Sequence, residues 1–66
     1  MSAERLIRLP SVESLTGLKR AHIYNLAREG KFPRPLKIGA RASAWRETQV
    51  QAWIEERIRE AQEGER

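Results

Sequence analysis

The 66-residue sequence contains no cysteine, no aspartate and only one histidine. Without cysteine, no disulfide or thiolate metal site can stabilise the fold. One histidine alone is too few ligands for a metal site. A nucleophile elbow and a glycine-rich phosphate loop are also missing. The sequence therefore predicts a protein that is not an enzyme and has no cofactor, no metal and no small-molecule substrate.

Long apolar runs are lacking as well. No stretch approaches the ~20 apolar residues of a membrane span, and the polar start, residues 1–5, does not resemble a signal peptide. We therefore expect a cytoplasmic protein with no membrane partner. A chain of this length has room for one hydrophobic core, so residues 1–66 are expected to form a single domain, with a core at 6–58 and a frayed tail at 62–66.

The net charge of +4 is unevenly distributed along the chain. Residues 1–18 are neutral, residues 19–46 hold eight basic residues against Glu29 alone, and residues 47–66 hold three arginines against six glutamates. A basic centre between neutral and acidic flanks predicts one basic surface that faces a polyanion. The simpler alternative is a solvated charged surface.

Two helices are expected in the first half of the chain. Ser11 is placed to cap a short first helix, and Gly17 can end it in a left-handed conformation. A second helix is expected from about Lys19 to Glu29, with Gly30 as its stop. It carries one apolar stripe at helical spacing: Ile23, Leu26 and Ala27.

A hairpin and a third helix are expected in the second half. Pro33 and Pro35 exclude helix, and the alternating pattern that follows predicts a hairpin over 36–46. A helix from Glu47 has an apolar face that should pack on the rest of the domain: Val50, Trp53, Ile54, Arg57, Ile58 and Ala61. The order helix, helix, hairpin, helix gives a mainly α fold with a small β-hairpin, a winged helix-turn-helix.

The second helix is the candidate DNA-reading element. In a helix-turn-helix the second helix enters the major groove, where arginine pairs with guanine and asparagine with adenine. The side chains expected to reach base edges or phosphates are Lys19, Arg20, His22 and Asn25. Tyr24 and Arg28 are placed better as phosphate contacts.

The hairpin supplies a second candidate contact. Arg41 lies near its tip between small residues, with Ser43 beside it, and such a slim basic arm suits a narrow minor groove. Lys31, Arg34 and Lys37 would then line the route between the grooves as phosphate partners.

Each of these residues has a simpler alternative. Tyr24 can cover the edge of the core, His22 can be an ordinary surface histidine, and Arg41 can be a soluble turn residue. Trp45 and Trp53 are expected in the core rather than as base-stacking platforms, because both lie in apolar patterns.

Several spaced stretches also resemble a known family: Arg8–Val12, Thr16–Arg20, Ile23–Tyr24, Gly30–Pro33, Trp45 and Val50–Ile54. Together they make residues 6–58 resemble the AlpA family of short prophage-type regulators, which is similar to MerR-like winged-helix proteins and phage excisionases. The resemblance implies a transcriptional regulator of a mobile element that acts on double-stranded DNA. The family usually has serine or threonine where Lys19 stands and often arginine where Asn25 stands. Because these differences lie on the DNA-reading face, the resemblance implies no target sequence.

Three functions remain open from the sequence. The favoured one is a regulator that occupies an operator, with double-stranded DNA and further copies of the chain, bound cooperatively, as its partners. The second is an excisionase that bends an attachment site. The third is a protein-interaction adapter that uses the helix at 47–61. RNA binding is less favoured, because no aromatic pair lies on a basic sheet.

Overall fold

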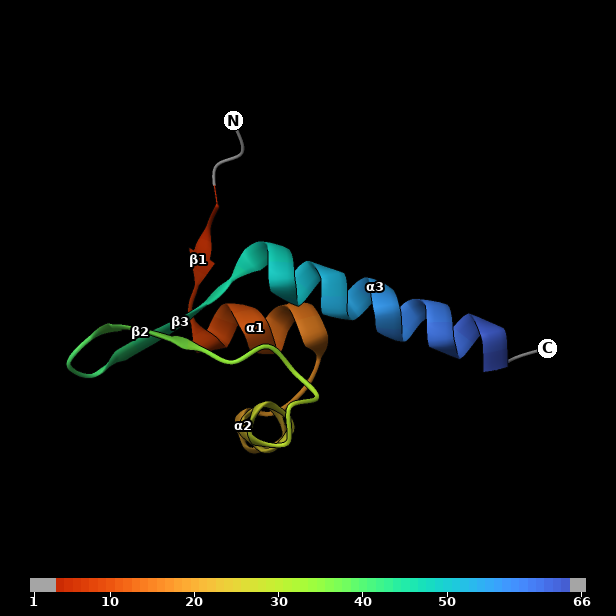
Figure 1. The fold of residues 1–66 in the computed structure, drawn as a ribbon, viewed down its shortest axis with the longest axis horizontal. Helices are drawn as coiled ribbons and strands as arrows, with labels where there is room; N and C mark the ends of the chain where they lie inside the picture. The colour runs from red at the N-terminus through yellow and green to blue at the C-terminus, as the bar shows by residue number, and fades with distance from the viewer. Residues whose placement is uncertain (1–3, 65–66) are drawn as a thin grey trace.

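The structure, a computed structural model, describes residues 4–64. Within them the chain forms β1 (Leu6–Ile7), α1 (Leu9–Thr16), α2 (Arg20–Arg28), β2 (Leu36–Gly39), β3 (Ala42–Arg46) and α3 (Glu47–Gly64) in that order (Figure 1). Three helices with a small antiparallel hairpin confirm the predicted fold class and are compatible with a winged helix-turn-helix.

Helix α1 begins earlier than predicted. Arg8 occupies its N-cap position without a side-chain hydrogen bond, and Pro10 lies in the first turn, where a missing N–H costs little. Ser11 therefore lies inside the helix, and its predicted capping role is wrong. Gly17 ends α1 as predicted, with a φ of 76°, and its N–H donates to the Glu13 carbonyl at 2.8 Å.

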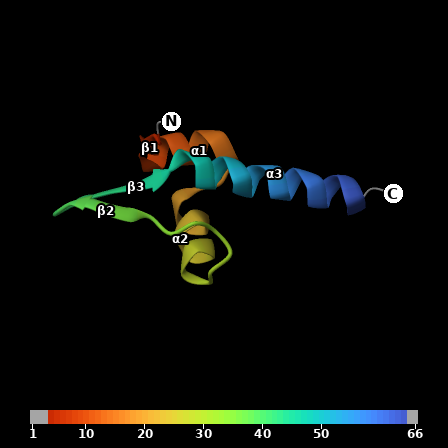
Figure 2. The ribbon, with the colours of Figure 1, turned by 45° about the horizontal axis from the view of Figure 1, so that its top comes forward.

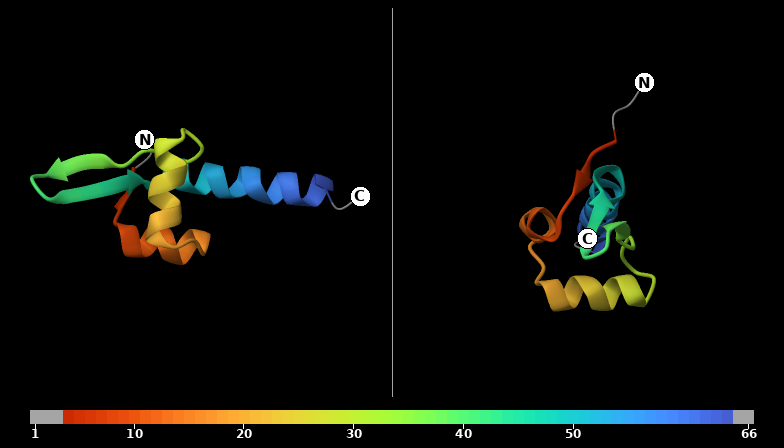
Figure 3. Two further views of the ribbon diagram at one scale, coloured as in Figure 1. Left: turned by 90° about the horizontal axis from the view of Figure 1, so that it is seen from below. Right: turned by 90° about the vertical axis from the view of Figure 1, so that its left-hand side faces the viewer.

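Helix α2 agrees with its predicted bounds. Lys19 is its N-cap residue and Glu29 its C-cap residue, while Gly30 follows with a φ of 78°. The buried side chains of α2 are Ile23 and Ala27. The helix runs crosswise to α3 beneath the core (Figure 3, left), so its outward face is free of other elements.

The sheet has one strand more than the sequence predicted. The hairpin of β2 and β3 is confirmed, but β1 also pairs with β3, giving the antiparallel order β1-β3-β2. Leu6 lies opposite Arg46 and Ile7 opposite Trp45. Two residues are too few to show an alternating pattern, which is why this strand was missed.

The N-terminal segment caps α3. The Glu47 N–H donates to the Arg5 carbonyl at 2.8 Å. The Thr48 N–H and hydroxyl donate to the Glu4 carboxylate at 3.3 and 2.9 Å. Hydrogen bonds from Thr48 and the nearby charge of Arg46 hold the pKa of Glu4 below its usual value. Donors that a helix start leaves free are thus satisfied from the far end of the chain.

The outer half of α3 does not pack on the domain. Val50 is buried, and Trp53 and Ile54 are half-buried, but Ile58 is 46% exposed. The apolar face was expected to pack along its whole length, and this is wrong beyond Arg57. The helix continues to Gly64, past its predicted end, and points away from the hairpin (Figures 1 and 2). Residues 65–66 of the expected tail lie outside the described residues.

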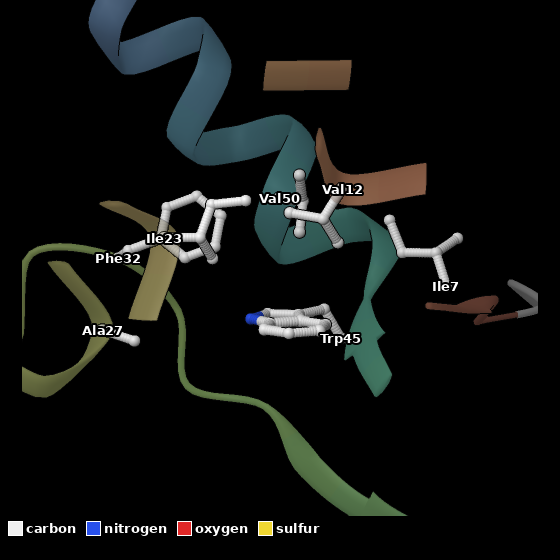
Figure 4. Packing of buried hydrophobic residues seen from close by; sticks show 7 residues of the cluster. All are labelled: Ile7, Val12, Ile23, Ala27, Phe32, Trp45 and Val50. Atoms are coloured by element: carbon white, nitrogen blue, oxygen red, sulfur yellow. The ribbon is translucent and has the colours of Figure 1, made fainter. Parts of the chain in front are cut away.

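The core lies where α1, α2, β1, β3 and the start of α3 meet. Trp45 is fully buried at its centre (Figure 4). In contrast, every residue of β2 is exposed, including Leu36 at 44% and Ile38 at 47%. The hairpin therefore extends beyond the core as a wing. The buried cluster consists of Ile7, Val12, Ile23, Ala27, Phe32, Trp45 and Val50.

Candidate nucleic-acid interface

The outward face of α2 carries an ordered polar pair. Arg28 donates from Nη2 to the Oδ1 of Asn25, one helical turn earlier, and both side chains are exposed. Arg28 uses one lone pair of the amide oxygen, so the second lone pair and the two amide N–H groups of Asn25 are left for an outside partner. The pair can therefore present an acceptor and donors in a fixed arrangement to a base edge.

Two further residues predicted for this segment are His22 and Lys19. His22 is exposed on α2, and within residues 4–64 no cluster of side chains could hold a metal ion. Lys19 lines a shallow hollow with Glu13, Ser14 and Gly17 at the turn between α1 and α2. Lys19 makes no side-chain cap bond, as expected of a residue with no acceptor atom.

A cleft of about 530 Å³ lies between α1, α2 and the wing. Three arginines line it: Arg8 at the N-cap of α1, Arg20 in α2 and Arg41 at the wing tip. The cleft thus unites residues predicted for the second helix with residues predicted for the wing. Its remaining lining is Leu9, Pro10, Glu13, Tyr24 and Ser43.

Tyr24 separates this cleft from a second basic hollow. Its ring lies 5.9 Å from that of Trp45 at an interplanar angle of 50°, so it covers the edge of the core as the simpler alternative expected. It is nevertheless 41% exposed. On its other side Arg28 and Arg34 line a hollow with Ala27 and Pro35. A basic track therefore runs along the junction of α2 and the hairpin.

The last predicted side chains lie at the ends of this track. The Lys37 ammonium donates to the Ala40 carbonyl at 3.3 Å, at the wing tip. Lys31 lies beyond α2, where its ammonium pairs with Glu29 at 3.7 Å. Both remain exposed, but neither lines the cleft or the Arg28–Arg34 hollow.

Known proteins identify the family of this chain. The family model described as prophage CP4-57 regulatory protein (AlpA) matches residues 5–58. The chain belongs to the AlpA family. Protein ORF88 of Enterobacteria phage P4, itself uncharacterized, is 41% identical over 58 residues, which cover 88% of this chain and 66% of the phage protein. This chain thus spans just under two thirds of that relative.

A second relative is similar over nearly its whole length. The DNA-binding transcriptional activator AlpA of Escherichia coli (strain K12) is 31% identical over 64 residues, which cover 88% of this chain and 91% of that protein. No solved structure matches this chain. The AlpA family match contains every buried residue of the described chain and stops at Ile58, where the apolar face of α3 is already exposed.

Ion pairing divides the basic residues of this AlpA-family chain into two groups. Within residues 4–64, the salt bridges use Arg5, Lys31, Arg46, Arg57 and Arg59, mostly on the β1 and α3 side of the molecule. Arg8, Arg20 and Arg41 take part in none of these described pairs. The cleft therefore holds positive charge that no carboxylate of the described chain neutralises by direct contact.

The sequence prediction missed Arg8 because charge was counted by segment. Arg8 belongs to the neutral first 18 residues, and only the packing of α1 brings it beside Arg20 and Arg41. Its place directly before Leu9-Pro10 was the available signal, since a proline in the first turn fixes where the helix starts.

Within residues 4–64, no helix is both long and apolar enough to cross a bilayer.

Proposed function

We propose that this chain is a sequence-specific, double-stranded DNA-binding transcriptional regulator of a prophage or integrative element. The observation that carries the proposal is the exposed face of α2 beside a track of basic side chains that form no salt bridge within residues 4–64. Membership of the AlpA family supports it, as does the likeness to a relative described as a DNA-binding transcriptional activator.

The geometry favours a division of roles along α2. Asn25, held by Arg28 on the outward face, is suited to read a base in the major groove, since asparagine pairs with adenine N6 and N7. Ala21 and His22, one helical turn earlier in α2, are also exposed. Arg20 and Tyr24 line the cleft instead, which favours phosphate contact over base reading.

The remaining basic residues fit the backbone of the duplex. Phosphate contacts set the position of a protein on DNA and carry no sequence information by themselves. Two roles for Arg41 follow from its place at the wing tip and the cleft: a phosphate contact, or insertion in a narrow minor groove. The other proposed phosphate contacts are Lys19, Lys31, Arg34, Lys37 and Ser43.

Selection of bound fragments from a random duplex pool tests the proposal. We expect one enriched site, bound about 10³-fold or more tightly than random duplex at the same salt concentration. Arg34→Ala should weaken binding to both duplexes, whereas the matched change Arg59→Ala on α3, where Arg59 pairs with Glu56, should leave binding unchanged. Equal affinity for the enriched site and random duplex would overturn sequence-specific recognition.

The same fragments separate the alternatives. Gel phasing of the enriched site with the protein bound measures its bend, and a strong bend would favour the excisionase that distorts an attachment site. Absence of binding to any duplex would leave the adapter that acts through α3. Stepwise titration shows whether copies bind cooperatively, because a second copy would then bind at a lower concentration than expected for independent sites.

A further inference from the structure

We infer that the cleft between α1, α2 and the wing is the seat of one backbone phosphate of the bound duplex, and that Arg8 is part of it. This inference rests on the proposed DNA-binding function and adds a contact outside the second helix and the wing. Arg8 at the N-cap of α1, Arg20 in α2 and Arg41 in the turn between β2 and β3 all line the cleft. A compact tetrahedral anion can accept hydrogen bonds from several directions at once, which a flat base edge cannot.

The side chains around the cleft suit a phosphodiester. Guanidinium groups bind phosphate with paired, charge-assisted hydrogen bonds. Tyr24 and Ser43 also line the cleft, and their hydroxyls can act as neutral donors. Glu13 is the single carboxylate that lines the cleft, so the lining keeps an excess of positive charge. Among residues 4–64, none of the three arginines is held in a salt bridge.

The start of α1 does not supply this site by itself. Pro10 has no N–H, and the N–H groups of Ser11 and Val12 already donate to the Arg8 carbonyl at 3.0 and 3.1 Å. The start of α1 therefore offers few free N–H groups, so the anion is held chiefly by side chains, among them that of Arg8 at the N-cap. Because Arg20 is also on α2, a phosphate in the cleft would border the groove that α2 enters, which favours the DNA backbone over a free anion.

The first test compares Arg8→Ala with the matched variant Arg5→Ala. We expect Arg8→Ala to weaken binding about tenfold on the enriched site and on random duplex alike, because a charged hydrogen bond to a phosphate is lost. The slope of log K against log salt should become shallower by up to about 0.9. Arg5 pairs with Glu47 at 3.6 Å outside the cleft, so Arg5→Ala should change neither quantity.

Both variants should fold. The Arg8 side chain makes no cap bond, and its backbone carbonyl, which accepts two hydrogen bonds, remains in Arg8→Ala. Removal of a cation from a helix start is neutral or slightly stabilising. Far-UV circular dichroism and the urea midpoint of each variant check this before binding is measured.

The opposite change to the cleft should strengthen binding. Glu13→Gln keeps the size of the side chain and the backbone bond from Gly17, but removes the negative charge that faces the phosphate. We expect Glu13→Gln to bind both duplexes severalfold more tightly than the parent protein does. In a protein that already carries Arg8→Ala, the same change should give no such increase, because the phosphate is then held less closely. No change in either Glu13→Gln or Arg8→Ala would overturn the inference.

A duplex with single neutral methylphosphonates locates the phosphate. The unmodified protein should lose affinity at one phosphate next to the α2 site, and Arg8→Ala should lose little more there, since the two changes remove the same contact. Additive losses at every position would overturn the inference while parental binding keeps the DNA proposal intact. Failure of the parent protein to bind any duplex would instead remove the proposed function.

Inorganic phosphate distinguishes the two sources of the anion. At constant ionic strength, millimolar phosphate should not compete with duplex beyond what chloride does, because a single phosphodiester is held together with its neighbours along the strand. Two results together would overturn the DNA assignment in favour of a free-anion site. The amide NMR signals of Arg8, Arg20 and Arg41 would shift on phosphate addition, and the effect of Arg8→Ala would be the same for the duplex with a methylphosphonate at any position.

Discussion

The indole Nε1 of Trp45 donates a hydrogen bond to the Pro33 carbonyl at 3.0 Å. Pro33 lies in the loop that follows α2. A second carbonyl of this loop, that of Lys31, accepts a hydrogen bond from the Nε1 of Trp53 in α3 at 2.7 Å. Phe32, between the two carbonyls, is buried against the Trp53 ring. The two tryptophans therefore fix the segment that joins α2 to the wing. Since the basic track crosses this junction, the indoles set the spacing between its two sides.

Trp45→Phe should destabilise the protein more than Trp53→Phe does. Trp45 is fully buried, so the variant leaves the part-buried Pro33 carbonyl without its donor and opens a void, with an expected loss of about 2–4 kcal/mol in the free energy of unfolding. Trp53 lies at the exposed edge of the core, where water can replace the donor. Urea unfolding followed by circular dichroism gives both values, and equal losses would contradict this view of the loop.

Asn25→Ala should lower the affinity for the enriched site but hardly that for random duplex. A lost two-bond contact to a base costs about 1–3 kcal/mol. Arg20→Ala, by contrast, should weaken both complexes alike, because Arg20 lines the cleft. Gln51→Ala, an exposed amide on α3, serves as the control. Fluorescence anisotropy on the two duplexes decides: equal losses for Asn25→Ala would exclude base reading by this residue.

Arg41→Ala should reduce affinity and the salt slope, with Lys37→Ala giving a smaller change. Lys37 already donates to the Ala40 carbonyl, whereas Arg41 makes no salt bridge among the described residues. Two duplexes with one core site and A·T-rich or G·C-rich flanks separate its proposed roles, since a narrow minor groove attracts arginine. A lost flank preference would assign Arg41 to that groove, an unchanged preference with lower affinity to a phosphate. No effect at all would remove the wing from the interface.

Glu4→Gln should lower stability at pH 7 and matter less in acid. Hydrogen bonds from Thr48 and the charge of Arg46 lower the pKa of Glu4 from its ordinary value of 4.5. Its stabilisation is therefore fully present above about pH 4.5 and is lost as the pH falls through the lowered folded-state pKa. Urea midpoints of the parent and variant should converge below this range. The control Glu55→Gln, on the exposed side of α3, should show no such convergence.

Two substitutions on α3 test where its packing ends. Val50→Ala should lower the free energy of unfolding by about 2 kcal/mol, because Val50 is fully buried in the core. Ile58→Ala should stay within about 0.5 kcal/mol, since Ile58 is 46% exposed. Thermal unfolding of both variants is the measurement. A large loss for Ile58→Ala would mean that the outer helix is covered in solution.

The order of the elements could be predicted because its signals are local. Gly17 and Gly30 take positive φ where the chain must leave a helix, and the spacing of Ile23 and Ala27 marks the buried side of α2. The wing was readable as well, from two prolines followed by an alternating pattern. Each of these signals depends on residues within a few positions of one another.

The features that were missed depend on residues distant in sequence. Strand β1 exists because Ile7 meets Trp45, and the cap of α3 exists because Glu4 meets Thr48. Likewise, Arg8 joins the cleft only through the packing of α1. The exposed outer half of α3 was missed for the opposite reason: its apolar spacing continues past Arg57, but no partner element lies within reach among the described residues.

The outer half of α3 and the wing lie at opposite ends of the longest dimension of the molecule, which measures 46 Å (Figure 1). Residues 55–64 of α3 hold four glutamates against Arg57 and Arg59, whereas the wing carries Arg41 and Lys37, so the protein is an electric dipole. In the electric field of a duplex such a dipole experiences a torque that turns the wing toward the DNA. At physiological salt this torque acts over a screening length of about 8 Å. Encounters would then begin already oriented, and the association rate should fall steeply as salt shortens the range of that torque.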